Sequence, residues 1–123
     1  MENILVIILA AVFYLLLKRI MPVVGVRHKT PAELKVKLKD KDMQFIDVRP
    51  SDAFRQDYIP GFENIPLNEL SAGIQKLERG NEIVLISDNP RGMKKASAKL
   101  KRRGFRYVTT VQGGIESWQE GGN

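Results

Sequence analysis

One stretch of the chain combines residue types that could bind or attack an anion. The apolar run at residues 83–86 (IVLI) is typical of a strand buried on both faces of a parallel sheet. Apolar residues at helical spacing begin at Met93, so the polar residues before it lie in a strand-to-helix loop. Free N–H groups and the positive dipole end make a helix start the natural anion site of open α/β sheets. The candidate residues of this anion-binding or partner-binding loop are Ser87, Asp88, Asn89, Arg91, Gly92, Lys94 and Lys95.

The same loop contains two residues that oppose anion binding. Pro90 lacks an N–H donor, and the carboxylate of Asp88 would repel an anion. Asp88 or Asn89 could instead cap the helix, with Pro90 at its first position. We therefore favour a capping role for these residues over a working anion site.

Further motifs lie on both sides of this loop. Residues 45–49 (FIDVR) and 58–66 (YIPGFENIP) precede it, and residues 112–118 (QGGIESW) follow it. In this order the motifs resemble the rhodanese-like family over residues 30–121. The resemblance implies an α/β fold, with an open parallel sheet and helices on both faces. It also implies structural roles for a set of polar, glycine and aromatic residues: Asp47, Arg49, Gly61, Gly113, Gly114 and Trp118.

The resemblance places Ser87 where rhodanese-like enzymes carry their catalytic cysteine. Sulfur transfer in that family proceeds through a cysteine persulfide, because a thiolate is populated near neutral pH and can attack and carry sulfane sulfur. Serine can do neither, and the sequence contains no cysteine. Related phosphatases and arsenate reductases close the loop with an arginine, whereas this chain has Gly92 there, next to Arg91. We therefore expect Ser87 to mark a vestigial cysteine position, with no catalytic residue and no cofactor.

Two enzymatic alternatives centre on the same loop. The family resemblance by itself suggests a sulfurtransferase acting on thiosulfate or a persulfide. A hydrolase could use Ser87 or Asp88, but the only histidine, His28, is far away in sequence and no other neighbouring residue could activate serine. With one histidine and no cysteine, we expect no metal site. The sequence favours a catalytically inactive binding or regulatory module over an enzyme.

The first part of the chain is predicted to be a membrane anchor. Residues 4–17 contain no charge, and through residue 21 a helix would extend about 27 Å, close to the ~30 Å hydrocarbon layer. A signal peptide would carry its positive charge before the apolar run, and a core helix would show a polar face. We predict a single transmembrane anchor at residues 1–21, a short linker at 22–29 and the domain at 30–121. Lys18 and Arg19 follow the apolar run, which places the domain on the cytoplasmic side of the cell membrane.

Basic residues dominate the segment after the loop. The formal net charge of the chain is +6, and no acidic residue lies between Asp88 and Glu116. The pattern fits a solvated helix face or an electropositive surface for anionic lipid or an acidic protein. Nucleic acid is disfavoured as a partner, because exposed aromatic residues are not interleaved with the basic ones. The basic residues are Arg91, Lys94, Lys95, Lys99, Lys101, Arg102, Arg103 and Arg106.

Other patterns predict the elements that position the loop. Thr30 is expected to cap a helix that has Pro31 at its first position. Asn68 is expected to cap a second helix that runs to Leu77, and Gly104 to end the helix that follows the loop. Two further strands are expected over residues 43–48 and 105–111.

Overall fold

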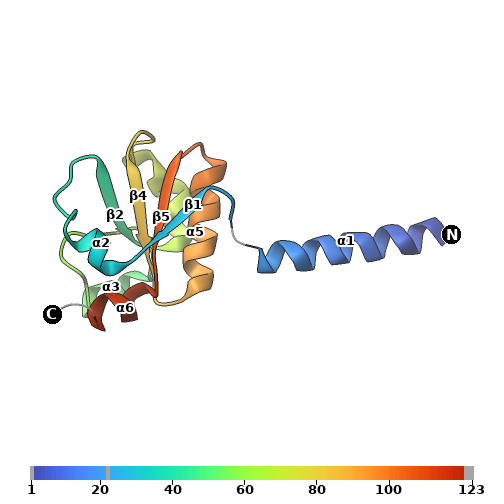
Figure 1. Ribbon diagram of the computed structural model, residues 1–123, viewed down its shortest axis with the longest axis horizontal. Helices are drawn as coiled ribbons and strands as arrows, with labels where there is room; N and C mark the ends of the chain where they lie inside the picture. The colour runs from blue at the N-terminus through green and yellow to red at the C-terminus, as the bar shows by residue number, and fades with distance from the viewer. Residues whose placement is uncertain (1, 22, 121–123) are drawn as a thin grey trace.

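The computed structural model of the chain describes residues 2–21 and 23–120, in which five parallel strands form one sheet in the order β1-β5-β4-β2-β3 (Figure 1). The central strand is β4 (Glu82–Ile86), and its residues 83–86 are completely buried, as the apolar run predicts. Ile83 and Leu85 enter one core cluster, whereas Val84 and Ile86 enter another on the opposite face. The other strands are β1 (Val26–Lys29), β2 (Met43–Asp47), β3 (Glu63–Asn64) and β5 (Tyr107–Val111).

Helices cover both faces of the sheet, which confirms the predicted fold class. On one face α5 (Pro90–Arg102) contributes Ala96 and Leu100 to the core. On the other face Leu34 and Trp118 come from α2 and α6. The remaining bounds are α2 (Pro31–Lys35), α3 (Ser51–Gln56), α4 (Leu70–Gly73) and α6 (Gly114–Glu120), with 3-10 turns η1 (Leu67–Glu69) and η2 (Ile74–Lys76).

The helix predicted from Asn68 to Leu77 is not continuous. The segment is divided into η1, α4 and η2, and Asn68 lies inside η1 instead of capping a helix. A Cβ at Gly73 would lie 2.7 Å from the side chain of Ile65, so the backbone approaches the neighbouring segment closely there. Packing against the sheet, rather than helical periodicity, therefore sets the path of this segment.

The linker predicted over residues 22–29 is wrong in its second half, because Val26–Lys29 form the edge strand β1 and pair with β5. Only Val26 packs against the core, while Arg27 and His28 are exposed, so the segment lacks the apolar pattern of a strand. Exposed charge is common on edge strands because it discourages pairing with other chains. In this structure the sheet begins at Val26.

A polar network joins β1, β4 and β5. Lys29 Nζ and Thr109 Oγ1 both donate to Glu82 Oε2, at 2.9 and 2.6 Å. Burial by itself raises the pKa of the Glu82 carboxyl, but these hydrogen bonds and the charges of Lys29 and Lys37 outweigh it and leave the pKa below its ordinary value. The ionised carboxylate therefore stabilises the network above that ordinary pKa, and the stabilisation is lost as the pH falls through the lowered pKa.

Helix α1 (Glu2–Ile20) lies outside the domain core. Within the described residues it is the one helix long and apolar enough to cross a membrane, and no residue of its window Asn3–Ile20 is buried in the protein. It extends away from the sheet on the side where α5 lies (Figure 1). The alternative of a buried core helix therefore does not match the structure.

Two truncations test where the domain starts. Removal of residues 1–21 should leave a folded domain, because it leaves the entire sheet intact. Removal of residues 1–29 also deletes β1, and at about 1 kcal/mol per lost hydrogen bond we expect a further loss of about 3 kcal/mol or more in the free energy of unfolding. Denaturant titration followed by circular dichroism measures both. Equal stability of the two truncated proteins would show that β1 is dispensable. If the protein that lacks only residues 1–21 is unfolded, α1 is part of the core.

Candidate functional site

Segments from three strands meet at the carboxyl edge of the sheet. Ser87 follows β4, and its carbonyl oxygen accepts the N–H of Ile115 from α6 at 3.0 Å. The N–H of Val48, just after β2, donates to the carbonyl oxygen of Ile86 at 3.0 Å. The loop after β4 and the motifs at residues 45–49 and 112–118 therefore come together around the end of β4.

Two glycines at the start of α6 are held in close contact with their surroundings, and the second of them lies against Ser87. Gly114 has a φ of +63°, and a Cβ there would lie 2.5 Å from the carbonyl oxygen of Ser87. Gly113 has a φ of +80°, and a Cβ there would lie 2.4 Å from the Cβ of Ser117. Backbone conformation and lack of space both require glycine at these positions.

The loop between β4 and α5 contains only three residues. Asn89 is the N-cap of α5, its Oδ1 accepts the N–H of Gly92 at 2.6 Å, and Pro90 begins the helix. The predicted cap is confirmed, and of the two candidates Asp88 and Asn89 it is Asn89. Because Pro90 has no N–H and the N–H of Gly92 is already bonded, the start of α5 offers few free donors to an anion.

The side chain of Ser87 faces a carboxylate. Ser87 is 3% exposed, and its hydroxyl donates to Asp88 Oδ1 at 3.3 Å. Asn89 Nδ2 donates to the same oxygen at 3.0 Å. A carboxylate at this place disfavours the negative charge of a bound anion or of a thiolate. A Cβ at Gly92 would lie 2.9 Å from Ser87 Oγ, so the helix start also confines the hydroxyl.

In the part of the chain that the structure describes, Ser87 is not closely paired with a residue that could act as its general base. The only hydrogen-bond partner of the Ser87 hydroxyl there is Asp88, and that bond is long. His28 Nδ1 is paired with Thr110 Oγ1 on β5 instead. Among these residues, no three potential metal ligands gather into a site. The arrangement does not supply the base and orienting group that an activated serine needs.

Asp47 and Arg49 form a buried ion pair on the segment after β2. Arg49 Nη2 lies 2.8 Å from Asp47 Oδ2, and Arg49 Nε lies 3.1 Å from both carboxylate oxygens. Arg49 Nη2 also donates to the carbonyl oxygen of Asp57 at 2.7 Å. These donors are used inside the protein, so the pair holds two segments of backbone together.

Gly61 and Trp118 belong to the packing on the sheet face that α2 and α6 cover. Gly61 has a φ of +96°, and a Cβ there would lie 3.1 Å from the side chain of Leu38. The Trp118 ring packs edge-on against Phe62, with ring centroids 5.1 Å apart. Both residues support the fold.

The basic residues of the predicted loop site lie apart from the buried hydroxyl of Ser87. Arg91 and Lys95 are exposed on α5. Lys94 Nζ donates to the carbonyl oxygen of Arg19, at the end of α1, at 2.6 Å. The candidate residues therefore separate into a closed loop at Ser87 and an outward-facing basic surface.

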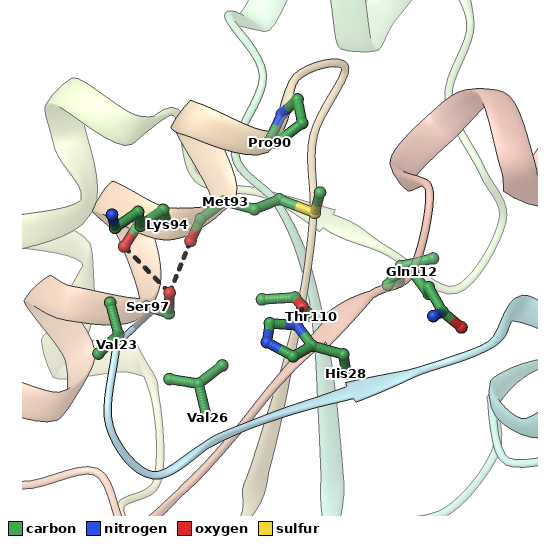
Figure 2. Close-up of a pocket in the computed structure, with 10 residues that line it drawn as sticks. Val23, Val26, His28, Pro90, Met93, Lys94, Ser97, Thr110 and Gln112 are labelled. Atoms are coloured by element: carbon green, nitrogen blue, oxygen red, sulfur yellow. Dashed lines mark hydrogen bonds between the residues drawn. The ribbon is translucent and has the colours of Figure 1, made fainter. Parts of the chain in front are cut away.

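Sequence reasoning missed a cavity of about 310 Å³ between α5 and the edge strand β1 (Figure 2). One feature of the sequence indicates this cavity: Val26 and His28 are two positions apart, which puts both side chains on the same side of a strand. The hydroxyl of Ser97 lies within hydrogen-bond distance of the carbonyl oxygens of Met93 and Lys94, so this polar group is satisfied internally. The lining residues are Val23, Val26, His28, Pro90, Met93, Lys94, Ser97, Thr110, Val111 and Gln112.

Comparison with known proteins agrees with the observed fold. The family model described as the rhodanese-like domain matches residues 30–121, which is most of the chain. This chain belongs to the rhodanese-like family. The matched region of the rhodanese-like domain begins just after β1, and α1 lies outside it.

Relatives of the rhodanese-like domain include proteins named for sulfur chemistry. YrkF of Bacillus subtilis (strain 168), named as a sulfur carrier protein, is 30% identical over 79 residues, which are 64% of this chain and 43% of YrkF. The chain thus spans less than half the length of that relative. GlpE of Pseudomonas savastanoi pv. phaseolicola, named as a thiosulfate sulfurtransferase, is 25% identical over 91 residues, which cover 74% of this chain and 86% of GlpE.

Solved structures have the same fold as the rhodanese-like domain. A rhodanese-like domain protein from Staphylococcus aureus superimposes with a TM-score of 0.68 at 25% sequence identity, over 75% of this chain and 90% of that one. The similarity leaves a quarter of the present chain unmatched.

The contact between Gly114 and Ser87 predicts the effect of one added methyl group. Gly114→Ala should lower the free energy of unfolding by about 2–4 kcal/mol, because alanine is strained at this φ and its Cβ would meet a backbone oxygen. Gly80→Ala is the matched control, since a Cβ there meets nothing within 4 Å, and we expect a change below about 0.5 kcal/mol. Denaturant titration of both variants measures the difference. Similar effects at the two positions would mean that the α6 contact does not constrain the loop.

Proposed function

We propose that this protein is a non-catalytic rhodanese-like module that α1 tethers to the cytoplasmic face of a membrane, where it binds a partner instead of transferring sulfur. The observation that carries the proposal is Ser87 at the position that follows β4, in a chain without cysteine. A serine hydroxyl is not ionised near neutral pH and cannot hold a persulfide, so the chemistry of the family lacks its carrier.

The contacts around Ser87 support a binding role over a catalytic one. A loop that cradles an anionic substrate needs free N–H donors and positive charge near its centre. Here the N–H of Gly92 is occupied by Asn89, and the carboxylate of Asp88 is next to the hydroxyl. The exposed cations of α5 point to an outer surface as the place where a partner binds.

The names of the relatives favour a sulfurtransferase as the second candidate function. YrkF and GlpE are named for carrying or transferring sulfur, and the present domain keeps their fold. A sulfurtransferase of this kind would need a nucleophile that this chain does not contain. We therefore place it second.

The membrane tether is supported by the composition and exposure of α1. Its apolar side chains from Ile4 to Leu16 are exposed in the protein, and exposed apolar surface of this extent requires another apolar environment. Lys18 and Arg19 lie in its last turn, next to the domain. Positive charge at that end is typical of a helix whose following segment stays in the cytoplasm.

An assay of sulfur transfer separates the two candidates. The natural full-length protein in detergent should form no thiocyanate from thiosulfate and cyanide above the rate without protein, because it offers no thiolate. GlpE of Pseudomonas savastanoi is the positive control, and Ser87→Ala is the matched variant. Thiocyanate formation that Ser87→Ala abolishes would establish the sulfurtransferase and remove our proposal.

The orientation of α1 can be measured cleanly because the chain has no cysteine. We expect a membrane-impermeant maleimide to label Asn3→Cys in intact cells, and to label Ser51→Cys only after the membrane is permeabilised. The unlabelled protein should stay in the membrane fraction after alkaline extraction. Labelling of Ser51→Cys in intact cells would show that the domain lies outside the cytoplasm. Release of the protein into the alkaline supernatant would exclude a spanning helix.

A further inference from the structure

The excess positive charge of the protein is confined to one segment. Residues 91–106 contain eight basic side chains and no acidic one. In the remainder of the chain twelve basic residues are outnumbered by fourteen acidic ones. The net charge of +6 therefore originates entirely from α5 and the turn that follows it.

On α5 this charge forms a surface, which we call the basic face: Arg91, Lys95 and Arg102. These residues recur after four and seven positions, so they lie on one side of the helix, and all three are exposed. The opposite side carries the buried Met93 and Leu100. In the described part of the chain, no acidic residue forms an ion pair with the basic face.

The basic face lies beside the segment through which the chain leaves α1. Lys94 Nζ donates to the carbonyl oxygen of Arg19, in the last turn of α1, at 2.6 Å. Lys101, two turns further along α5, reaches Gly25, where an added Cβ would lie 3.0 Å from its Nζ. Figure 1 shows α5 on the side of the domain that faces α1, with its axis running across that of α1. A bilayer that α1 crosses would thus lie on the α5 side.

We propose that α5 lies along the membrane surface and that its basic face binds the headgroups of anionic phospholipids. This inference rests on the membrane tether proposed above and names the partner of the tethered module. A helix of 13 residues is about 20 Å long, so a helix parallel to the bilayer plane presents all three cations to the headgroup layer at once. Anionic lipids on the cytoplasmic leaflet attract clusters of lysine and arginine in this position.

The composition of the basic face favours a lipid surface over an acidic protein. Protein interfaces usually combine arginine with buried aromatic or large apolar anchors inside a polar rim. Between Arg91 and Arg102 the only uncharged residue on the basic face is Ala98, which follows Lys95 by three positions. A surface of exposed lysine and arginine side chains suits a fluid layer of phosphate and carboxylate groups, because such a layer requires no surface of fixed shape.

Single labels can measure the distance of each face from the bilayer. The full-length protein carries a fluorescent donor on Ala98→Cys, at the centre of the basic face, or on Ala32→Cys, an exposed alanine on α2. Each is reconstituted in phosphatidylcholine vesicles with or without phosphatidylserine, with an energy acceptor attached to lipid headgroups. We expect stronger transfer from Ala98→Cys than from Ala32→Cys when phosphatidylserine is present, and a smaller difference between the two labels without it. High salt should weaken the transfer from Ala98→Cys.

Two charge reversals with equal change in net charge identify the surface. The triple variant Arg91→Glu, Lys95→Glu, Arg102→Glu removes the basic face, and Lys37→Glu, Lys39→Glu, Lys41→Glu changes three exposed lysines elsewhere. In the Ala98→Cys protein, the first variant should reduce the ratio of docked to undocked domain at least about 100-fold, and the second should leave it nearly unchanged. An equal effect of both variants would overturn the proposal.

Vesicle flotation separates failure of this inference from failure of the tether. Protein that floats with vesicles and resists alkaline extraction, yet shows equal transfer from Ala98→Cys and Ala32→Cys, keeps the tether and overturns lipid binding by α5. Protein that does not float overturns the tether, and with it this inference. Far-ultraviolet circular dichroism of the charge variants tests whether these exposed substitutions leave the domain folded, as we expect.

Discussion

Ile83 and Leu85 face one core of the domain, and Val84 and Ile86 face the other. A central strand that is buried on both sides requires a cover of helices on each face, and α5 supplies one cover while α2 and α6 supply part of the second. Because all five strands are parallel, their carboxyl ends lie at one edge of the sheet. The position of Ser87, of the Asp47–Arg49 pair and of the glycines at the start of α6 follows from this arrangement.

Much of the fold could be predicted because its signals are local. The apolar run of β4, the apolar spacing of α5 and the left-handed Gly104, with a φ of +89°, are each encoded within a few neighbouring residues. Strand β1 and the broken helix at residues 67–76 were not predicted correctly. Their conformation depends on pairing with β5 and on close contact between Gly73 and Ile65, which a local pattern does not reveal.

In the candidate site, too, local contacts could be predicted from the sequence and long-range contacts could not. Capping of α5 by Asn89 is a contact between residues three positions apart, and the sequence predicts a cap at Asp88 or Asn89. The contact of Gly114 with the carbonyl oxygen of Ser87 joins segments that are distant in sequence, and only a resemblance to a known family pointed to those glycines. A helix cap contributes about 1 kcal/mol, and here it uses a backbone donor that an anion-binding loop would leave free. In this loop the same N–H group cannot serve both helix stability and ligand binding.

The inclusion of β1 in the sheet also shortens the chain that connects the domain to α1. Five residues separate Ile20 from Val26, and even a fully extended segment of that length covers only about 18 Å. For a domain held by a spanning α1, this length limits its height above the bilayer to less than its own diameter. Encounters with a partner would then be governed by lateral diffusion in a thin layer, and a second membrane-bound protein would meet this domain far more often than a protein free in solution.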